Sequence, residues 1–336
     1  MNSGKTITIK DIATALNIHH STVSRALNNH PDVNKNTKIL VKQMAKQLDY
    51  HPNLFARNLK TNRTNVIGVI VPEIKHFFFA SIISGIEEVA HREGYALLLS
   101  QSNESYEREV INTEALASNR VAGLLVSISQ TTKNDLHFKD LQKQGISLVF
   151  FDRVMPNFKA STVVVDDYNG AFMATEFLIK KGYKRIAHIG GSKNFMITKN
   201  RFKGYNDALK KYNILLDEEL IYFGGFHEKN GNEGMQYLFG AVNKPDAVFA
   251  VNDPVAIGAY EAIKSRGLKI PDDIAIVGFS DNPVTALITP PLTTMKQPAY
   301  DMGKEAAELL FKHIKNKTHE IEKIVLGTYL IERSST

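Results

Sequence analysis

The sequence TIKDIATALNIHHSTVSRALN, residues 8–28, decides how the amino-terminal part of this 336-residue chain folds. Thr8 is a candidate helix N-cap, and the apolar residues that follow it recur at helical spacing. The pattern breaks at residues 17–20 and resumes over residues 21–27. The stretch therefore predicts two short helices joined by a tight turn.

A third helix and the outward face of the second helix complete the predicted unit. We expect the third helix to begin after Asn34, which caps it, and to end around Leu48. The second helix leaves His20, Ser21 and Arg25 free to point outward. Arginine presents forked donors that match the two major-groove acceptors of guanine, and the first residues of a recognition helix usually reach the bases. The pattern therefore favours a unit that reads DNA.

Positive charge is concentrated in the same part of the chain. Residues 1–64 hold 10 Lys or Arg against 3 Asp or Glu, whereas the other residues hold 31 against 32. A basic run without a motif is most simply a solvated face, but this one accompanies a helix-turn-helix pattern. A local positive field suits phosphate contacts and predicts binding that weakens steeply as salt rises.

Three motifs give the sequence a resemblance to a known family. They are T-I-K-D-I-A (8–13), S-T-V-S-R-A-L-N (21–28), and Y-H-P-N followed by A-R-N-L-K (50–60). With them the chain resembles the lactose/galactose repressor (LacI/GalR) family of bacterial transcriptional regulators, and the likeness continues to the last strand. The resemblance implies that residues 53–61 fold into a hinge helix only on DNA and pair with their twin in a dimer.

The resemblance also implies which residues contact the operator. His20, Ser21 and Arg25 would be the principal major-groove readers, and Leu59 would wedge between base pairs in the minor groove. The full implied set is His20, Ser21, Thr22, Arg25, Asn28, Asn34, Thr37, Asn53, Ala56, Leu59 and Lys60. An exposed leucine on a basic segment gains an apolar partner from unstacked bases, which supports the wedge independently. The alternative is that Leu59 packs on the core or lies in a plain linker.

From residue 65 onward, short apolar strands alternate with helices. The length of the chain suits two or three domains. The strands are near-continuously apolar, as parallel strands covered on both faces should be. A first set falls at residues 66–72, 95–101, 122–127 and 147–152, and a second set at residues 161–167, 185–191, 247–253 and 274–281. The pattern predicts an α/β core with two lobes, each a doubly wound parallel sheet.

The predicted fold is thus an N-terminal helix-turn-helix head plus a two-lobed core. The resemblance implies a periplasmic-binding-protein-like clamshell whose chain crosses between the lobes near residues 163, 293 and 324. The predicted domains are residues 1–48 for the head, 49–63 for the hinge, 64–163 plus 294–323 for the N-terminal lobe, and 164–293 plus 324–336 for the C-terminal lobe. Residues 323–332 are predicted to form a final strand pair.

Ligands of open α/β sheets bind beyond the carboxyl ends of the strands, so residues there are the first candidates for an effector site. Matching to the family gives Pro72, Phe78, Phe79, Asp152, Arg201, Phe226, Asn252, Ser280 and Asp281. Arg201 is the strongest candidate, because its forked donors can hold a hydroxyl, phosphate or carboxylate at two points. The plainer alternative for Phe78 and Phe79 is a place in the core. For Asp152 it is a helix cap, and for Asn252 a turn.

One departure from the family pattern bears on the ligand. Many sugar-binding relatives carry Gly-Phe/Tyr-Asp-Asp where this chain has Gly-Phe-Ser-Asp at residues 278–281. A hydroxyl thus replaces a carboxylate that would accept hydrogen bonds from a sugar, which argues against simple hexose recognition. An aromatic side chain such as Phe226 would cover the apolar face of a sugar or base. Sugars, sugar phosphates, nucleosides and purine-like molecules remain open as effector classes.

Enzymatic functions find little support in the sequence. It has no Gly-x-Ser-x-Gly, Walker loop or His-Glu-x-x-His motif, and Gly-Gly-Ser at residues 190–192 is a weak phosphate signal by itself. The absence of cysteine excludes disulfides and thiolate catalysis. The eleven histidines are scattered, so we expect neither a metal site nor a cofactor. A sugar-processing enzyme would need catalytic acid and base pairs in the cleft.

Export and membrane insertion also lack their sequence signals. No apolar run reaches the ~18 residues needed to cross a bilayer, and the N-terminus has no signal-peptide pattern. A stand-alone solute-binding protein, the other alternative, would need export. We therefore expect a cytoplasmic, nucleoid-associated protein without a membrane partner.

Together these patterns predict a ligand-responsive transcriptional regulator, and a repressor because most relatives repress. One short recognition helix reads too few base pairs, so we expect a homodimer on a palindromic operator. A small-molecule effector in the cleft would change the angle between the lobes and, by allostery, the affinity for operator DNA. No leucine heptads follow the last strand, so nothing predicts a tetramer.

Overall fold

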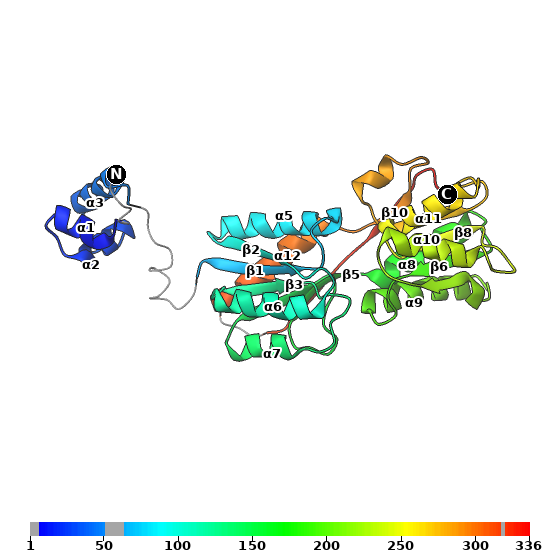
Figure 1. Ribbon diagram of the computed structural model, residues 1–336, viewed down its shortest axis with the longest axis horizontal. Helices are drawn as coiled ribbons and strands as arrows, with labels where there is room; N and C mark the ends of the chain where they lie inside the picture. The colour runs from blue at the N-terminus through cyan, green and yellow to red at the C-terminus, as the bar shows by residue number, and fades with distance from the viewer. Residues whose placement is uncertain (1–6, 51–63, 317–319) are drawn as a thin grey trace. The chain divides into compact units, whose positions relative to one another are not determined.

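The computed structural model describes residues 7–50, 64–316 and 320–336. Contacts divide the chain into two units, residues 1–64 and 65–336, which we call the head and the core (Figure 1). Each unit has hydrophobic clusters of its own, and each is described separately. Within the described ranges, no helix combines the length and the apolar character that a bilayer span requires.

The head contains three helices around a small apolar core. They are α1 (Ile9–Ala15), α2 (His20–Leu27) and α3 (Lys35–Gln47). Thr8 caps α1, as predicted, and its backbone N–H donates to the Asp11 carboxylate at 2.7 Å. Asn34 caps α3, also as predicted, because its Oδ1 accepts from the Thr37 N–H at 2.8 Å. The buried residues are Ile12, Ala13, Val23, Ala26, Val33, Val41 and Ala45.

The first lobe of the core, the N-lobe, is a six-stranded parallel sheet in the order β11-β5-β4-β3-β1-β2. Its strands are β1 (Val66–Val71), β2 (Ala96–Gln101), β3 (Gly123–Val126), β4 (Ser147–Phe151), β5 (Ser161–Val165) and β11 (Lys323–Leu326). One face carries α5 (Phe77–Arg92) and α12 (Ala299–Asn316), and the other carries α6 (Tyr106–Ser118) and α7 (Leu136–Lys143). Interior strands are buried because helices cover both faces.

The second lobe, the C-lobe, repeats this plan with strand order β12-β10-β9-β8-β6-β7. Its strands are β6 (Ile186–Gly190), β7 (Ile221–Phe223), β8 (Ala247–Ala250), β9 (Ala275–Ser280), β10 (Thr293–Lys296) and β12 (Tyr329–Ile331). Helices α8 (Asp167–Lys180) and α9 (Met196–Lys211) pack on one face, and α10 (Glu228–Leu238) and α11 (Asp253–Ser265) on the other (Figure 1). Two 3-10 turns, η1 (Glu218–Leu220) and η2 (Pro283–Ala286), complete the lobe. Among the strands of this lobe that the structure describes, β12 alone runs antiparallel to its neighbour.

The structure corrects the predicted boundaries between the lobes. Strand β5, predicted in the second set, lies in the N-lobe sheet, as does β11, whereas β10 lies in the C-lobe sheet. The predicted boundaries after residues 163, 293 and 323 therefore cut through three intact strands. The two final strands predicted within residues 323–332 are present as β11 and β12, but they do not pair with each other, because β11 pairs with β5 and β12 pairs with β10. Each crossing strand completes its backbone hydrogen bonds in one sheet before the chain passes to the other.

Candidate functional site

The candidate DNA-reading surface of the head lies on α2. His20 and Arg25 are exposed there, and Ser21 is half-buried beside them. His19 caps the helix, because its Nδ1 accepts from the Ser21 N–H at 3.3 Å. The same Nδ1 lies 2.8 Å from Ser21 Oγ, so the cap also orients the serine hydroxyl. His19 was not among the residues predicted to contact DNA, although it caps the helix that presents them.

The other predicted DNA-contacting residues fall partly at helix ends. Thr22 is half-buried on α2, and exposed Asn28 follows the helix and donates from Nδ2 to the Ser24 carbonyl at 2.8 Å. Asn34 and Thr37 begin α3 through their capping bond. One polar group of each asparagine thus already ends or starts a helix. The remaining predicted residues lie outside the described ranges: Asn53, Ala56, Leu59 and Lys60.

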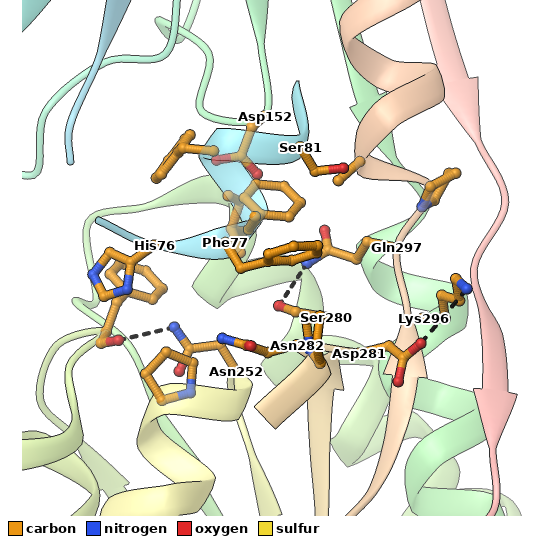
Figure 2. Close-up of a pocket in the computed structure, with 18 of the residues that line it drawn as sticks. His76, Phe77, Ser81, Asp152, Asn252, Ser280, Asp281, Asn282, Lys296 and Gln297 are labelled. Atoms are coloured by element: carbon orange, nitrogen blue, oxygen red, sulfur yellow. Dashed lines mark hydrogen bonds and ion pairs between the residues drawn. The ribbon is translucent and has the colours of Figure 1, made fainter. Parts of the chain in front are cut away.

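A cavity of about 450 Å³ lies between the two lobes of the core (Figure 2). Both sheets contribute the segments that follow the carboxyl ends of their strands, where open α/β sheets bind ligands. Eight of the nine predicted effector residues line it: Phe78, Phe79, Asp152, Arg201, Phe226, Asn252, Ser280 and Asp281. Pro72 does not line it. Its carbonyl instead accepts from the Asn103 N–H at 2.9 Å, which continues the pairing of β1 with β2 inside the N-lobe.

Arg201 reaches the cavity from α9 with only 3% of its surface exposed. Its Nε donates to Asp167 Oδ1 at 2.8 Å, and its Nη2 lies 2.7 Å from the same oxygen. Nη1 donates to the Val251 carbonyl, and the guanidinium lies 3.6 Å from the centre of the Phe279 ring. These contacts fix the orientation of the side chain. Together they engage three of the five N–H donors of the guanidinium.

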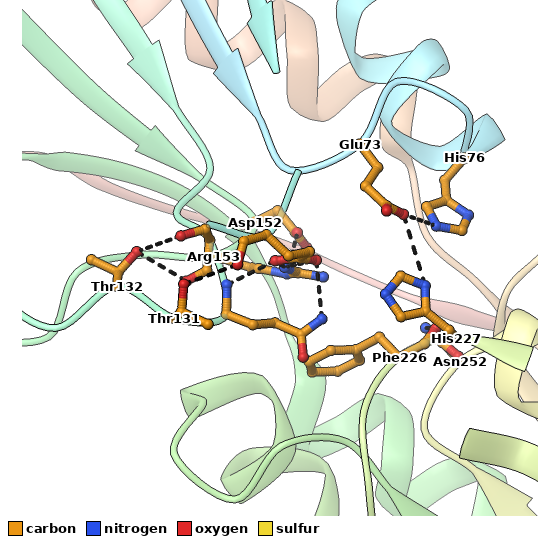
Figure 3. Close-up of polar contacts among 12 residues, drawn as sticks. Glu73, His76, Thr131, Thr132, Asp152, Arg153, Phe226, His227 and Asn252 are labelled. Carbon is orange, nitrogen blue, oxygen red and sulfur yellow. Dashed lines mark hydrogen bonds and ion pairs between the residues drawn. The ribbon is translucent and has the colours of Figure 1, made fainter. Parts of the chain in front are cut away.

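A second buried arginine, Arg153, also lines the cavity (Figure 3). Its Nη1 donates to the two carboxylate oxygens of Glu104 at 2.7 and 2.9 Å. Its guanidinium lies over the Phe226 ring, 4.8 Å from the centre, so that ring has a cation on one side. Sequence reasoning missed Arg153 and Glu104. The available signal was that Arg153 directly follows Asp152 at the end of a strand.

Burial and charge shift the acidity of two carboxyl groups at this site in opposite directions. Burial raises the pKa of Asp152 to about 6, and the nearby Arg153 charge offsets only part of that effect. Burial alone would also raise the pKa of Glu104, but the charge and hydrogen bonds of Arg153 and those of Gln130 hold it below its ordinary value. A ligand therefore meets a carboxylate locked to arginine and a second carboxyl that gains or loses a proton near neutral pH.

The C-lobe wall combines strained backbone with engaged polar groups. Ser280 and Asp281 have φ angles of 145° and 61°, a conformation that L-residues rarely adopt and that clusters at ligand sites. Ser280 Oγ accepts from Gln297 Nε2 at 3.0 Å, and Asp281 Oδ1 accepts from Arg333 Nη2 at 2.7 Å. Within the described residues, buried Gln297 Oε1 has no hydrogen-bond partner. A ligand donor would satisfy it.

Some residues that line the cavity also have the structural roles that were considered as alternatives to ligand binding. Phe79 is 4% exposed and belongs to the N-lobe core. Asn252 caps α11, because its Oδ1 accepts from the Val255 N–H at 2.9 Å, and its Nδ2 donates to the Phe226 carbonyl at the same distance. Asp152 follows β4, and no described helix begins there.

A cluster of possible metal ligands lies at the edge of the cavity, contrary to the expectation from scattered histidines. Glu73, His76 and His227 offer donor atoms that all lie within 4.8 Å of one another. His76 and His227 are far apart in the sequence and belong to different lobes. The fold brings them together, which spacing along the chain could not show.

A basic helix-turn-helix head and a two-lobed core with a polar cavity define a class of protein that couples DNA binding to ligand binding. Residues 8–53 match the family described as bacterial regulatory proteins, lacI family, and residues 175–336 match the periplasmic binding protein-like domain. The chain belongs to the lacI family of bacterial regulatory proteins. It is a DNA-binding transcriptional regulator and not an enzyme.

Similar proteins span almost the whole chain. The regulator RegA of Clostridium saccharobutylicum and the repressor PurR of Histophilus somni strain 129Pt are each 35% identical over 98% of both chains. Among solved structures, the transcriptional regulator CelR in complex with cellobiose has a TM-score of 0.76 and 29% identity, and the match covers 98% of this chain and all of that one.

Proposed function

We propose that this regulator is a homodimeric repressor that binds a palindromic operator through α2 and responds to a small-molecule effector held between its lobes. The observation that carries the proposal is the cavity of about 450 Å³ lined by the strand ends of both sheets, on a chain with a basic helix-turn-helix head. Its partner would be chromosomal DNA, so we propose a cytoplasmic, nucleoid-associated protein.

The DNA-binding part of the proposal assigns base contacts to His20, Ser21 and Arg25. Their position on α2 supports this, because that helix follows α1 after a tight turn, as a recognition helix does. Residues 49–63 would form the hinge, with Leu59 as the minor-groove wedge. Asn28, Asn34 and Thr37 would contact phosphates and fix the register of the head on the duplex.

The dimer part of the proposal rests on the need for two half-sites and on an exposed apolar edge. One recognition helix covers few base pairs, and two copies a helical turn apart multiply specificity. Strand β2 lies at the edge of the N-lobe sheet and exposes Leu98 and Leu99 by 40% and 37%. An unpaired apolar edge strand is a template for a second chain, so a second copy of the core would cover it.

The effector part of the proposal follows from the mixed lining of the cavity. Arg201, Gln297 and Asn252 offer donors and acceptors, while Phe79 and Phe226 offer apolar faces. That combination suits a small polar molecule with a flat or ring-shaped apolar surface. CelR was solved with cellobiose, which supports a small-molecule ligand in this class of core. Sugars, sugar phosphates, nucleosides and purines are the classes to screen.

Effector binding would change operator affinity by favouring one arrangement of the lobes. The effector can shift the equilibrium only by its differential affinity for the two arrangements. Coupling of about 1–3 kcal/mol is typical of allosteric proteins, which corresponds to roughly a 5- to 150-fold change in affinity. Since coupling is reciprocal, operator DNA would change effector affinity by the same factor.

The decisive experiment measures operator binding by fluorescence anisotropy with DNA from upstream of the protein's own gene. We expect specific binding that falls by about 10³–10⁵ between roughly 50 and 200 mM salt if the dimer makes six to ten phosphate contacts. Arg25→Ala should weaken specific binding by about 10- to 100-fold, the usual effect of losing one bidentate base contact. The matched control is Arg108→Ala, an exposed arginine on α6 of the core, which should bind normally. Undiminished binding by Arg25→Ala would contradict the proposed role of α2.

A further inference from the structure

Three side chains from the two lobes converge at the edge of the effector cavity (Figure 3). Glu73 and His76 lie in the segment between β1 and α5, and His227 is the N-cap of α10. Glu73 Oε2 lies 2.6 Å from His76 Nε2 and 3.8 Å from His227 Nδ1. The two imidazole rings are stacked, with their centres 5.7 Å apart. The carboxylate thus lies between histidines that belong to different lobes.

The donor set has the chemistry of a transition-metal site. Two imidazoles and one carboxylate suit Zn²⁺, which takes nitrogen and oxygen ligands at about 2.0–2.2 Å, and they suit Mg²⁺ and Ca²⁺ poorly. Donor atoms around one tetrahedral ion lie roughly 3.3–3.6 Å apart at those bond lengths. The observed distances of 2.6 and 3.8 Å bracket that spacing, so small side-chain rotations gather all three. The side chains are 16–33% exposed, which leaves an ion a path from solvent.

We propose that Glu73, His76 and His227 bind a Zn²⁺ ion that joins the two lobes at the rim of the effector cavity. Both histidines also line that cavity, so the ion would lie beside the effector. Three protein ligands leave a fourth position for water or another ligand. An ion that needs donors from both lobes favours the arrangement in which those donors meet. Zn²⁺ would therefore act on the arrangement of the lobes in addition to the effector, and without any contribution from the head.

Two features disfavour a cation at this site, and the negative charge of the Glu73 carboxylate offsets both. Helices α5 and α10 begin at the site, and helix N-termini favour anions. Lys75 Nζ lies 3.5 Å from Glu73 Oε2, but that side chain is 66% exposed and can turn into water. Binding of a cation at this site therefore depends on the negative charge of Glu73. Without metal, Glu73 is hydrogen-bonded to His76 of its own lobe and lies 3.8 Å from His227 of the other lobe.

Isothermal titration calorimetry of the full chain with ZnCl₂, after removal of bound metal by a chelator, tests the proposal. We expect a single strong site in the wild type and no comparable binding of MgCl₂. His76→Ala and His227→Ala should each weaken Zn²⁺ binding by at least the roughly 10- to 100-fold that loss of an outer-shell partner costs. His91→Ala removes an exposed histidine at the end of α5, outside the cluster, and should leave the affinity unchanged.

Wild-type affinity in both His76→Ala and His227→Ala would overturn the proposal, because Zn²⁺ would then bind elsewhere on the chain. Circular dichroism shows whether each variant is folded. If either alanine variant unfolds, Glu73→Gln keeps the shape and removes the charge. Co²⁺ bound to the wild type should give the visible absorption of a low-coordinate nitrogen and oxygen site, and Glu73→Gln should lose it. Unchanged absorption in that variant would equally overturn the proposal, and neither readout depends on DNA or effector.

Discussion

Arg201 and Asp167 form an ion pair in which both side chains are almost fully buried. Removing either partner would leave an uncompensated buried charge, which typically costs about 3–5 kcal/mol. The pair therefore holds the guanidinium in one place before any ligand arrives. A ligand that uses the remaining donors has little ordering cost to overcome, because the side chain has already lost its rotational freedom.

Asp152 supplies a test of the electrostatics of the cavity. Because burial raises its pKa from 3.8 to about 6, the folded chain holds this proton more tightly than the unfolded chain does. The contribution to stability is therefore fully present below about pH 4 and is lost as the pH rises through about 6. Relative to Asp152→Asn, the wild type should lose up to about 3 kcal/mol of unfolding free energy between pH 4 and 7, as measured by urea denaturation.

The matched control for that measurement is Asp140→Asn, which removes an exposed carboxylate from α7. Its difference from the wild type should stay nearly constant over the same pH range. If the curves for the wild type and Asp152→Asn run parallel, Asp152 titrates normally and the burial argument is wrong.

At the scale of elements, α5 and α12 pack with their backbones in contact. A Cβ atom added at Gly85 would lie 2.1 Å from the Tyr300 carbonyl oxygen, and one added at Gly303 would lie 2.0 Å from that of Ile82. Both distances are far shorter than any real contact. These glycines therefore set the distance between the two helices that cover one face of the N-lobe sheet.

Gly85→Ala should consequently destabilise the core, even though alanine favours an isolated helix by about 1 kcal/mol. Forcing the helices apart should lower the unfolding free energy by about 1–3 kcal/mol or more. Urea denaturation provides the measurement. Ser84→Ala, the neighbouring exposed position, should change stability by no more than roughly 0.5 kcal/mol. Equal stability of the two variants would mean that the helices are not in close contact.

Local sequence patterns predicted where the helices and strands lie. They could not predict which strands pair with one another. Thr8 and Asn34 could be predicted as helix N-caps because capping depends on residues only three positions away. The sheet to which β5, β10 and β11 belong depends on partners far along the chain, and the predicted boundaries failed there. The strands themselves were visible as short apolar runs.

The candidate site shows the same division. Parallel-sheet geometry pointed to the ends of the strands, and the family resemblance supplied the individual residues, of which all but Pro72 line the cavity. Glu104 could not be predicted, because only the folded chain shows that it pairs with Arg153. The approach of His76 to His227 is likewise a product of the fold.

At the scale of the whole molecule, head and core have separate hydrophobic clusters and should act as separable parts. A chain lacking residues 1–63 should lose operator binding yet keep the rise in melting temperature that an effector causes. A ligand at about 100 times its dissociation constant stabilises the native state by about 2.7 kcal/mol. Differential scanning fluorimetry against sugars, sugar phosphates, nucleosides and purines measures this in both chains. Tight operator binding by the shortened chain would contradict the role of the head.

The three passages between the lobes limit how the core can move. In the N-lobe, β5 and β11 are hydrogen-bonded neighbours where the chain leaves, and in the C-lobe β10 neighbours β12. Two lobes joined by one chain segment could rotate in any direction. Neighbouring connecting segments resist sliding and twisting, so the remaining motion is bending about one axis. A small molecule bound between the lobes would therefore act on one direction of motion, the bending of one lobe against the other.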